Sequence, residues 1–114
     1  MGANNLSIRE ITKLVSDKVQ NAMGDNLHKI ILYGSYARGD YNEESDIDIM
    51  VLADINDEAL HTMEKALWDI GWDIGYKNDL MISVFLKNTD QFYEWMDTIA
   101  YYRNIIEDGV VLYG

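Results

Sequence analysis

The sequence predicts an α/β domain of the α+β class, in which helices pack on a small mixed β-sheet of three to four strands. Amphipathic stretches with helical spacing alternate along the chain with short runs rich in isoleucine, leucine and valine. There is no proline, no low-complexity run and no internal repeat. At 114 residues the chain has room for one core, so we expect a single domain over residues 1–114, with residues 1–5 as a disordered N-terminus.

The first helix is expected to begin after Ser7, whose hydroxyl can cap it. Glu10 stands three residues later and completes a capping box. Gly24 suits the C-terminal cap. The predicted buried face comprises Ile8, Ile11, Leu14, Val15, Val19 and Met23.

Two apolar runs predict the first two strands, over residues 28–33 and 46–53. Residues 35–41 lie between them and predict a short helix or turn that begins just after Gly34. A second long helix is expected to start at Asn56 or Asp57 and to end between Gly71 and Gly75.

The third strand is predicted over Asp79 to Leu86, where apolar residues alternate with period two. Its open face would carry Asp79, Met81, Ser83 and Phe85. A last helical region, capped by Asn88, Thr89 or Asp90, is expected to run to about Asp108 with a break near Asp97. Residues 110–113 would then form a short edge strand.

The most informative pattern is Gly34-Ser35, ten residues, and then Asp46-Ile47-Asp48. A glycine at a strand end lets the backbone approach a phosphate, and a helix N-terminus offers free N–H groups to an anion. Side chains two apart in a strand share a face, roughly 6.7 Å apart along the chain. Two carboxylates so placed can hold Mg²⁺, and phosphate oxygens complete the coordination of the ion. The pattern therefore predicts a site for a nucleoside triphosphate and its metal.

The composition narrows the range of functions. Twenty acidic residues against nine basic ones give a formal net charge of −11, which argues against direct binding to a nucleic-acid backbone. A nucleotide bound through Mg²⁺ or a basic protein partner is compatible with this charge. There are no cysteines, no signal sequence and no apolar run long enough to cross a membrane, so we expect a cytoplasmic protein without disulfides or membrane contact.

The segment from Gly34 to Asp48 resembles the nucleotidyltransferase superfamily that includes DNA polymerase β. In length and in its Ala37-Arg38-Gly39 insert it is similar to the minimal nucleotidyltransferases of bacteria and archaea. The resemblance covers residues 6–114 and implies a palm-like fold.

The resemblance also implies a reaction, in which AMP moves from ATP or another NTP to an acceptor hydroxyl. Asp46 and Asp48 would bind Mg²⁺, with Mn²⁺ as an alternative, while Gly34 and Ser35 would hold the β- and γ-phosphates. The implied partner is a small helical HEPN-type toxin, with one of its tyrosines as acceptor. A homodimer is a further option.

Three points stay open in the sequence. Full members of the superfamily carry a third carboxylate on a neighbouring strand, and we expect that position at Met81, so that Asp79 would have to substitute as metal ligand and catalytic residue. Arg38 can either reach a phosphate or pair with Asp40 or Glu44. Tyr36 and Tyr41 can either touch a base or pack within the turn. Without a third carboxylate, the alternative function is a catalytically weak or inactive module that binds nucleotide or partner.

Overall fold

The computed structural model describes residues 6–42 and 45–114. Residues 1–5, predicted to be a disordered N-terminus, lie outside this part, as do Glu43 and Glu44. The helices and strands, in chain order, are α1 (Ile8–Met23), a 3-10 turn (Gly24–Asn26), β1 (Leu27–Tyr33), α2 (Ser35–Arg38), β2 (Ile47–Ala53), α3 (Asp57–Asn78), β3 (Ile82–Asn88), α4 (Thr89–Trp95), α5 (Ala100–Asp108) and β4 (Val110–Tyr113).

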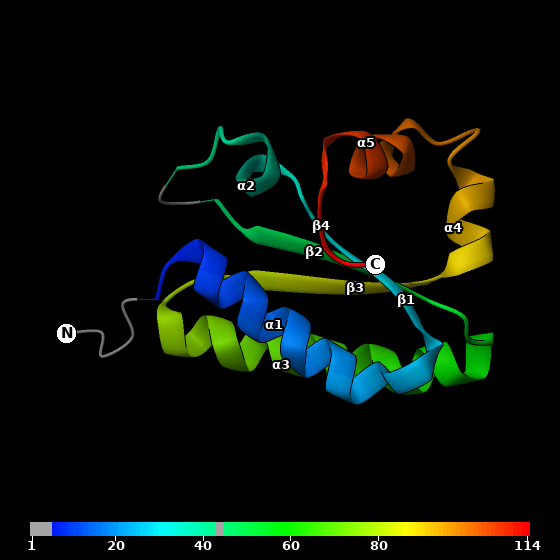
Figure 1. The fold of residues 1–114 in the computed structure, drawn as a ribbon, viewed down its shortest axis with the longest axis horizontal. Coiled ribbons are helices and arrows are strands. Elements are labelled where there is room, and N and C mark those ends of the chain that lie inside the picture. Colours follow the sequence, from blue (N-terminus) through cyan, green and yellow to red (C-terminus); the bar gives the residue numbers. More distant parts are fainter. Residues whose placement is uncertain (1–5, 43–44) are drawn as a thin grey trace.

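The four strands form one mixed sheet in the order β3-β2-β1-β4 (Figure 1). β1 runs antiparallel to both β2 and β4, whereas β2 and β3 are parallel. Parallel neighbours need a crossover connection, and α3 supplies it. The predicted mixed sheet and its short edge strand are confirmed.

The capping box predicted for α1 is present. The Ser7 hydroxyl accepts from the Glu10 N–H at 3.1 Å, and the Ser7 N–H donates to the Glu10 carboxylate at 3.0 Å. Most of the predicted apolar stripe is buried, but Leu14 is 36% exposed, because it stands at the border of the helical face that meets the sheet.

α3 continues past both glycines at which it was predicted to end. A Cβ on Gly71 would lie 2.8 Å from the carbonyl oxygen of Ile82, and one on Gly75 would collide with the carbonyl oxygen of Leu80. The two glycines therefore let the helix pack directly against the start of β3. Close packing outweighs the roughly 1 kcal/mol that each glycine costs in a helix.

The third strand begins at Ile82, so its predicted start at Asp79 is wrong. Asp79 has a left-handed backbone (φ 58°, ψ 43°), and its N–H bonds to the carbonyl of Gly75 as the C-cap of α3. Aspartate tolerates this conformation better than most residues. Asp79 therefore does not share the strand face of Ser83 and Phe85.

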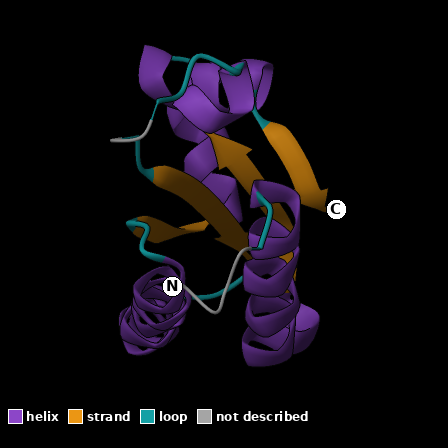
Figure 2. Ribbon diagram, turned by 90° about the vertical axis from the view of Figure 1, so that its left-hand side faces the viewer, coloured by secondary structure: helices purple, strands orange, loops and turns teal. Residues whose placement is uncertain are grey.

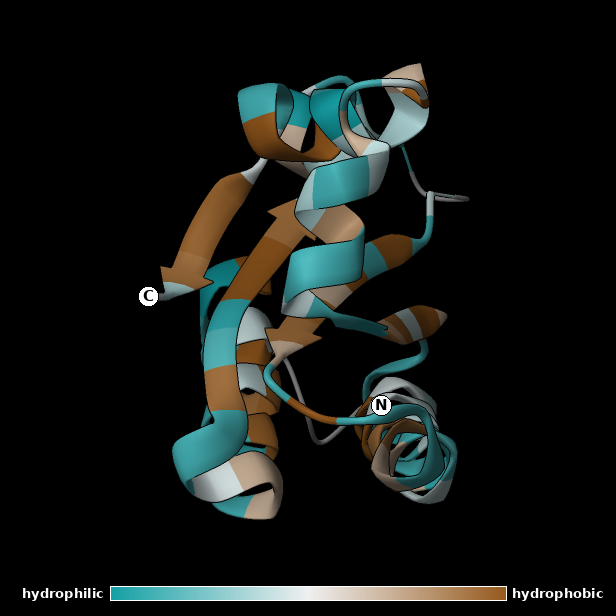
Figure 3. Cartoon of the chain, turned by 90° about the vertical axis from the view of Figure 1, so that its right-hand side faces the viewer, coloured by the Kyte–Doolittle hydropathy of each residue, from teal (hydrophilic) through white to brown (hydrophobic). Residues whose placement is uncertain are grey.

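The two faces of the sheet are covered unequally, as the edge-on view shows (Figure 2). On the α1–α3 face, the two long helices close over aliphatic residues of all three long strands. On the α4–α5 face, a smaller cluster joins the sheet to two short helices, and it comprises Ile31, Tyr33, Met50, Leu52, Phe92 and Ile105. The strands are hydrophobic along most of their length, and the helices are amphipathic (Figure 3). Asp48 belongs to the less covered α4–α5 face.

None of the helices in the described residues is both long enough and apolar enough to span a bilayer.

Candidate functional site

Gly34 joins the two halves of the motif. It follows the last residue of β1 and caps α2 with φ 78° and ψ −155°, a conformation open to glycine and strained for other residues. A Cβ at this position would lie 2.8 Å from the Asp48 Oδ2. Any side chain here would therefore displace the Asp48 carboxylate, so the glycine provides both the turn and the room for the acid.

The predicted short helix is a single turn that begins at Ser35. The carbonyl of Gly34 accepts the N–H groups of Ala37 and Arg38, both at 3.1 Å. The first amides of a helix have no acceptor within the helix. The half-buried Ser35 thus presents its backbone and hydroxyl next to the glycine that touches Asp48.

Asp48 lies on the inner strand β2, opposite Tyr33 of β1 and Ser83 of β3. It is half-buried, whereas Asp46 lies exposed just before the strand. Burial is the main cause that raises the pKa of Asp48 above its usual value, and the nearby charge of Asp46 adds to it. The sheet therefore forces two carboxylates into an unfavourable pair, and a bound cation would relieve the repulsion.

The residue paired with Asp48 on the neighbouring strand is Ser83, and Met81, the position expected for a third carboxylate, lies two residues before it. Met81 precedes β3, and its carbonyl accepts the Ile47 N–H at 2.9 Å. Its side chain is 45% exposed and lines a different depression, together with Asp79 and Trp72. Within residues 6–42 and 45–114, no three acidic, histidine or cysteine side chains lie close enough to hold a metal. Among the described residues, the candidate metal site therefore contains the carboxylates of Asp46 and Asp48.

A pocket opens around Asp48 on the α4–α5 face. Helix α5 contributes one wall through residues that share a helical face. The lining residues are Tyr33, Gly34, Arg38, Asp48, Phe85, Tyr101, Asn104, Ile105 and Asp108. The residues of α5 were not among the predicted site residues. Their spacing, with polar residues at 101, 104 and 108 around the buried Ile105, was the signal that they line a polar pocket next to a core contact.

Tyr33 and Tyr101 form a hydrogen-bonded pair beside Asp48. Their hydroxyl oxygens are 2.9 Å apart, and their rings meet edge to face. Burial, followed by the hydrogen bond to Tyr101, raises the pKa of Tyr33 well above its usual value. Tyr33 therefore keeps its proton, and the hydrogen bond between the two hydroxyl groups ties α5 to β1.

The structure bears on the alternatives that the sequence left open for Arg38, Tyr36 and Tyr41. The Arg38 Nε lies 3.2 Å from the Asp40 Oδ2, and both side chains are largely exposed. Arg38 also lines the Asp48 pocket, so its phosphate role stays a prediction. The rings of Tyr36 and Tyr41 stack on each other with centroids 4.3 Å apart, as expected for packing within the turn.

Comparisons with known proteins agree with this geometry. A family model described as "Nucleotidyltransferase domain" matches residues 8–112. A protein of Methanocaldococcus jannaschii named "Putative protein adenylyltransferase MJ0604" is 33% identical over 108 residues, which are 94% of this chain and 95% of the relative.

Two solved structures share the fold. A toxin-antitoxin crystal structure with AMP-PNP aligns at a TM-score of 0.56 and 21% identity, over 90% of this chain and 73% of that one. A mutant of the toxin-antitoxin MntA-HpeT aligns at a TM-score of 0.55 and 21% identity, over 96% of this chain and 74% of that one. The family match over nearly the whole chain, the full-length relative and the contact between Gly34 and Asp48 lead to one conclusion: the chain belongs to the nucleotidyltransferase domain family and is a nucleotidyltransferase.

Proposed function

We propose that this protein transfers AMP from ATP to a tyrosine hydroxyl of a partner protein in a reaction that needs a divalent cation. The observation that carries the proposal is the contact between Gly34 and the Asp48 carboxylate, because it unites the phosphate-binding turn and the metal-binding acids in one site. The relative named as a protein adenylyltransferase supports AMP as the group transferred and a protein as the acceptor.

The residues present fit Mg²⁺. This ion usually takes one or two carboxylates and completes its coordination with water and substrate phosphate. Asp46 and Asp48 provide two carboxylates whose mutual repulsion a cation would relieve. Asp79, which caps α3, is not part of the proposed metal site. When bound, the metal supplies positive charge that neutralises the triphosphate.

The chain's own residues position the reactants. Gly34 and Ser35 bind the terminal phosphates at the start of α2, and Arg38, which lines the pocket with Gly34, offers a positive charge to them. Tyr33 and the face of α5 line the same pocket and hold the rest of the nucleotide in place. Positioning and charge neutralisation therefore account for most of the catalysis.

In the reaction, the acceptor oxygen attacks the α-phosphorus of ATP. The new bond from the tyrosine oxygen to phosphorus forms as the bond from the α-phosphorus to pyrophosphate breaks, and pyrophosphate leaves with the electron pair. The phenolic proton passes to a carboxylate of the Asp46–Asp48 pair and then to water. This assignment gives Asp48, the acid nearer the turn, the larger share in catalysis.

The proposed partner is a HEPN-type toxin, and modification of its tyrosine would silence it. The resemblance to minimal nucleotidyltransferases and the toxin-antitoxin neighbours of the fold support this antitoxin role. The large negative charge of the chain fits a basic partner.

A second candidate is a binding module that acts by contact alone. The observation that favours it is Ser83, which occupies the place beside Asp48 where a third carboxylate would assist catalysis.

Label transfer separates the two candidates. The protein is incubated with Mg²⁺, ATP labelled at the α-phosphate and lysate of its source organism. We expect label on a protein band with wild type and a loss of at least about 1,000-fold with Asp48→Asn, because one acid of the pair is gone. Asp69→Asn is the matched control, since Asp69 is an exposed carboxylate that pairs with Lys65 on α3.

Label with both wild type and Asp48→Asn would refute the assigned site. Wild type that binds Mg-ATP and its partner, but transfers no label, would establish the binding module.

A further inference from the structure

The outer edge of β3 is open. β3 is the last strand in the order β3-β2-β1-β4, and none of the described strands pairs with its other side. The Ile47 N–H bonds to the carbonyl of Met81, which sets the phase of the parallel ladder. The backbone groups of Ile82, Val84 and Leu86 therefore point away from β2, where an extended chain could pair with them.

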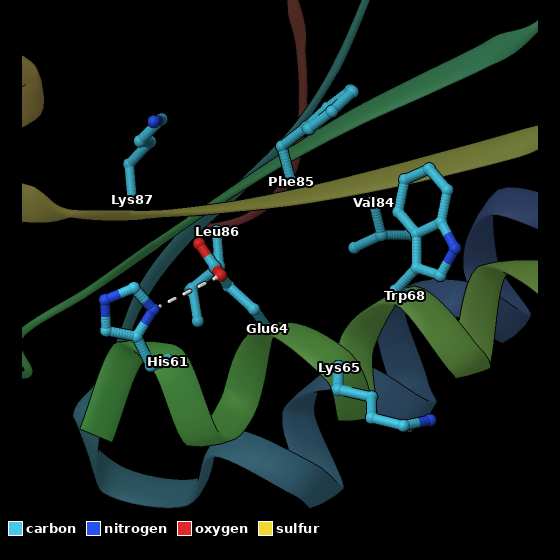
Figure 4. A pocket seen from close by; sticks show the side chains of 8 residues that line it. All are labelled: His61, Glu64, Lys65, Trp68, Val84, Phe85, Leu86 and Lys87. Carbon is cyan, nitrogen blue, oxygen red and sulfur yellow. Dashed lines mark ion pairs between the residues drawn. The ribbon is translucent and has the colours of Figure 1, made fainter. Parts of the chain in front are cut away.

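The open edge borders a groove against α3, shown close up in Figure 4. Trp68 of α3 stands over the groove with its ring centroid 6.2 Å from that of Phe85. Both side chains are partly exposed, at 44% for Trp68 and 39% for Phe85. Sheet edges are usually protected by charged side chains, but the one lysine of β3, Lys87, has its ammonium 5.8 Å from the Trp95 ring. The Trp68–Phe85 part of the edge is thus apolar and accessible, while the charged side chains of Glu64, Lys65 and Lys87 line the rest of the groove.

The groove and the pocket around Asp48 meet at one shared residue. Phe85 lines both, and Ser83 lies directly beside Asp48. A residue of an added strand next to Ser83 would point its side chain to the α4–α5 face, two strand spacings or about 9.6 Å from the Asp48 backbone. A tyrosine is long enough to cross the small Ser83 side chain toward Asp48, whereas a serine or threonine hydroxyl stops short.

The charge of the chain favours one kind of partner at the edge of β3. The chain carries 20 acidic and nine basic residues, so two copies repel each other when they approach edge to edge. The net negative charge of the chain attracts a basic segment.

We propose that the edge of β3 and the Trp68 groove bind the acceptor protein through an extended, basic segment. The segment adds a strand to the sheet and places its tyrosine over Ser83, facing Asp48. This inference rests on the proposed AMP transfer and names the form in which the acceptor is presented.

The test uses synthetic nine-residue peptides in which valine and threonine alternate around a central tyrosine, with lysines at both ends. AMP transfer from α-labelled ATP and Mg²⁺ is measured as kcat/KM. We expect transfer to the tyrosine peptide and none to the same peptide with a central serine. N-methylation of alternate amides on one edge of the peptide should lower transfer at least about tenfold, while methylation of the other edge should change it little, because only one edge pairs with β3.

Protein variants provide the second arm. Trp68→Glu should lower kcat/KM for the peptide at least about tenfold, with binding of a non-hydrolysable ATP analogue unchanged. Val111→Glu is the matched control, since Val111 is a 52% exposed apolar residue on the opposite edge strand β4. It should leave transfer unchanged.

The outcomes separate this inference from the proposed function. Wild type that labels a protein in lysate, but shows no difference between the two methylated peptides and none with Trp68→Glu, overturns the edge site alone. The same holds if Trp68→Glu only converts a dimer to a monomer, because the edge then binds a second copy. Wild type that labels neither lysate protein nor peptide overturns both.

Discussion

The α1–α3 face and the α4–α5 face of the same sheet differ in how completely they are packed. On the first, two long helices bury an aliphatic layer in which Ile49 and Val51 have no exposed surface. On the second, short helices cover only part of the sheet, and a pocket opens around Asp48 there. Alternate residues of one strand thus serve the core and the candidate site, which explains how a small domain can tolerate two repelling carboxylates.

Substitutions at two neighbouring residues of β2 compare how much each face of the sheet contributes to the stability of the fold. Ile49 and Met50 are both buried but belong to opposite faces. We expect Ile49→Ala to lower the free energy of unfolding by about 4 kcal/mol and Met50→Ala by about 2 kcal/mol, because the smaller cluster can relax around the cavity. Urea denaturation of both variants checks this. Equal losses would mean that both faces are equally well packed.

Two glycines of the motif turn give the next comparison. Gly34→Ala should cost about 2 kcal/mol of stability, because of its positive φ and the collision with Asp48, and should lower AMP transfer at least about tenfold. Gly39 also has a positive φ, but a Cβ there would meet nothing within 4 Å. Gly39→Ala should therefore cost about 1 kcal/mol and leave transfer nearly intact. A similar activity loss in both variants would show that strain alone disables the site.

The Asp48 carboxylate should weaken the fold that carries it. Its pKa is raised in the folded state, so the folded protein binds more protons than the unfolded one, and stability falls as pH rises from the unfolded pKa through the folded pKa. Asp48→Asn should then raise the melting temperature at pH 7 and lose this advantage at acidic pH, below both pKa values. Asp46→Asn, which removes only the repulsion, should give a smaller rise. An unchanged melting temperature at pH 7 for Asp48→Asn would contradict the assignment.

The smallest expected change concerns the residue beside Asp48. Ser83→Asp would place a third carboxylate next to the pair, so it should lower stability by about 1 kcal/mol without metal and tighten Mg²⁺ binding. Ser83→Asn is the uncharged control of similar shape. Titration of Mg²⁺ followed by thermal melting compares them. Equal Mg²⁺ affinity in the two variants would place Ser83 outside the metal site.

Much of the fold follows from local patterns in the sequence. The capping box of α1, the strands that flank the motif and the break between α4 and α5 depend on neighbours in the chain, and the structure agrees with all of them. The errors concern positions fixed by tertiary contacts. Gly71 and Gly75 were predicted to end the helix, but they lie within it because β3 packs closely against them. Asp79 was predicted to start the strand, but it is the C-cap of the longer helix.

The candidate site was predictable in part for the same reason. Gly34, Ser35, Asp46 and Asp48 stand close together in the sequence, and the contact of Gly34 with Asp48 brings the two halves of the motif together. The register that sets Ser83 beside Asp48 depends on how α3 returns the chain to the sheet. The wall formed by Tyr101, Asn104 and Asp108 comes from a distant helix. Local patterns do not specify such pairings.

The contact between Gly34 and Asp48 has a further consequence for the order of folding. It closes a short loop within the β1–β2 hairpin, whereas β3 must wait for a 22-residue helix before it can join the sheet. Short loops lose less chain entropy on closure, so local pairs assemble sooner than distant ones. The catalytic turn should thus be among the earliest contacts of the nascent domain, and the acceptor edge among the last.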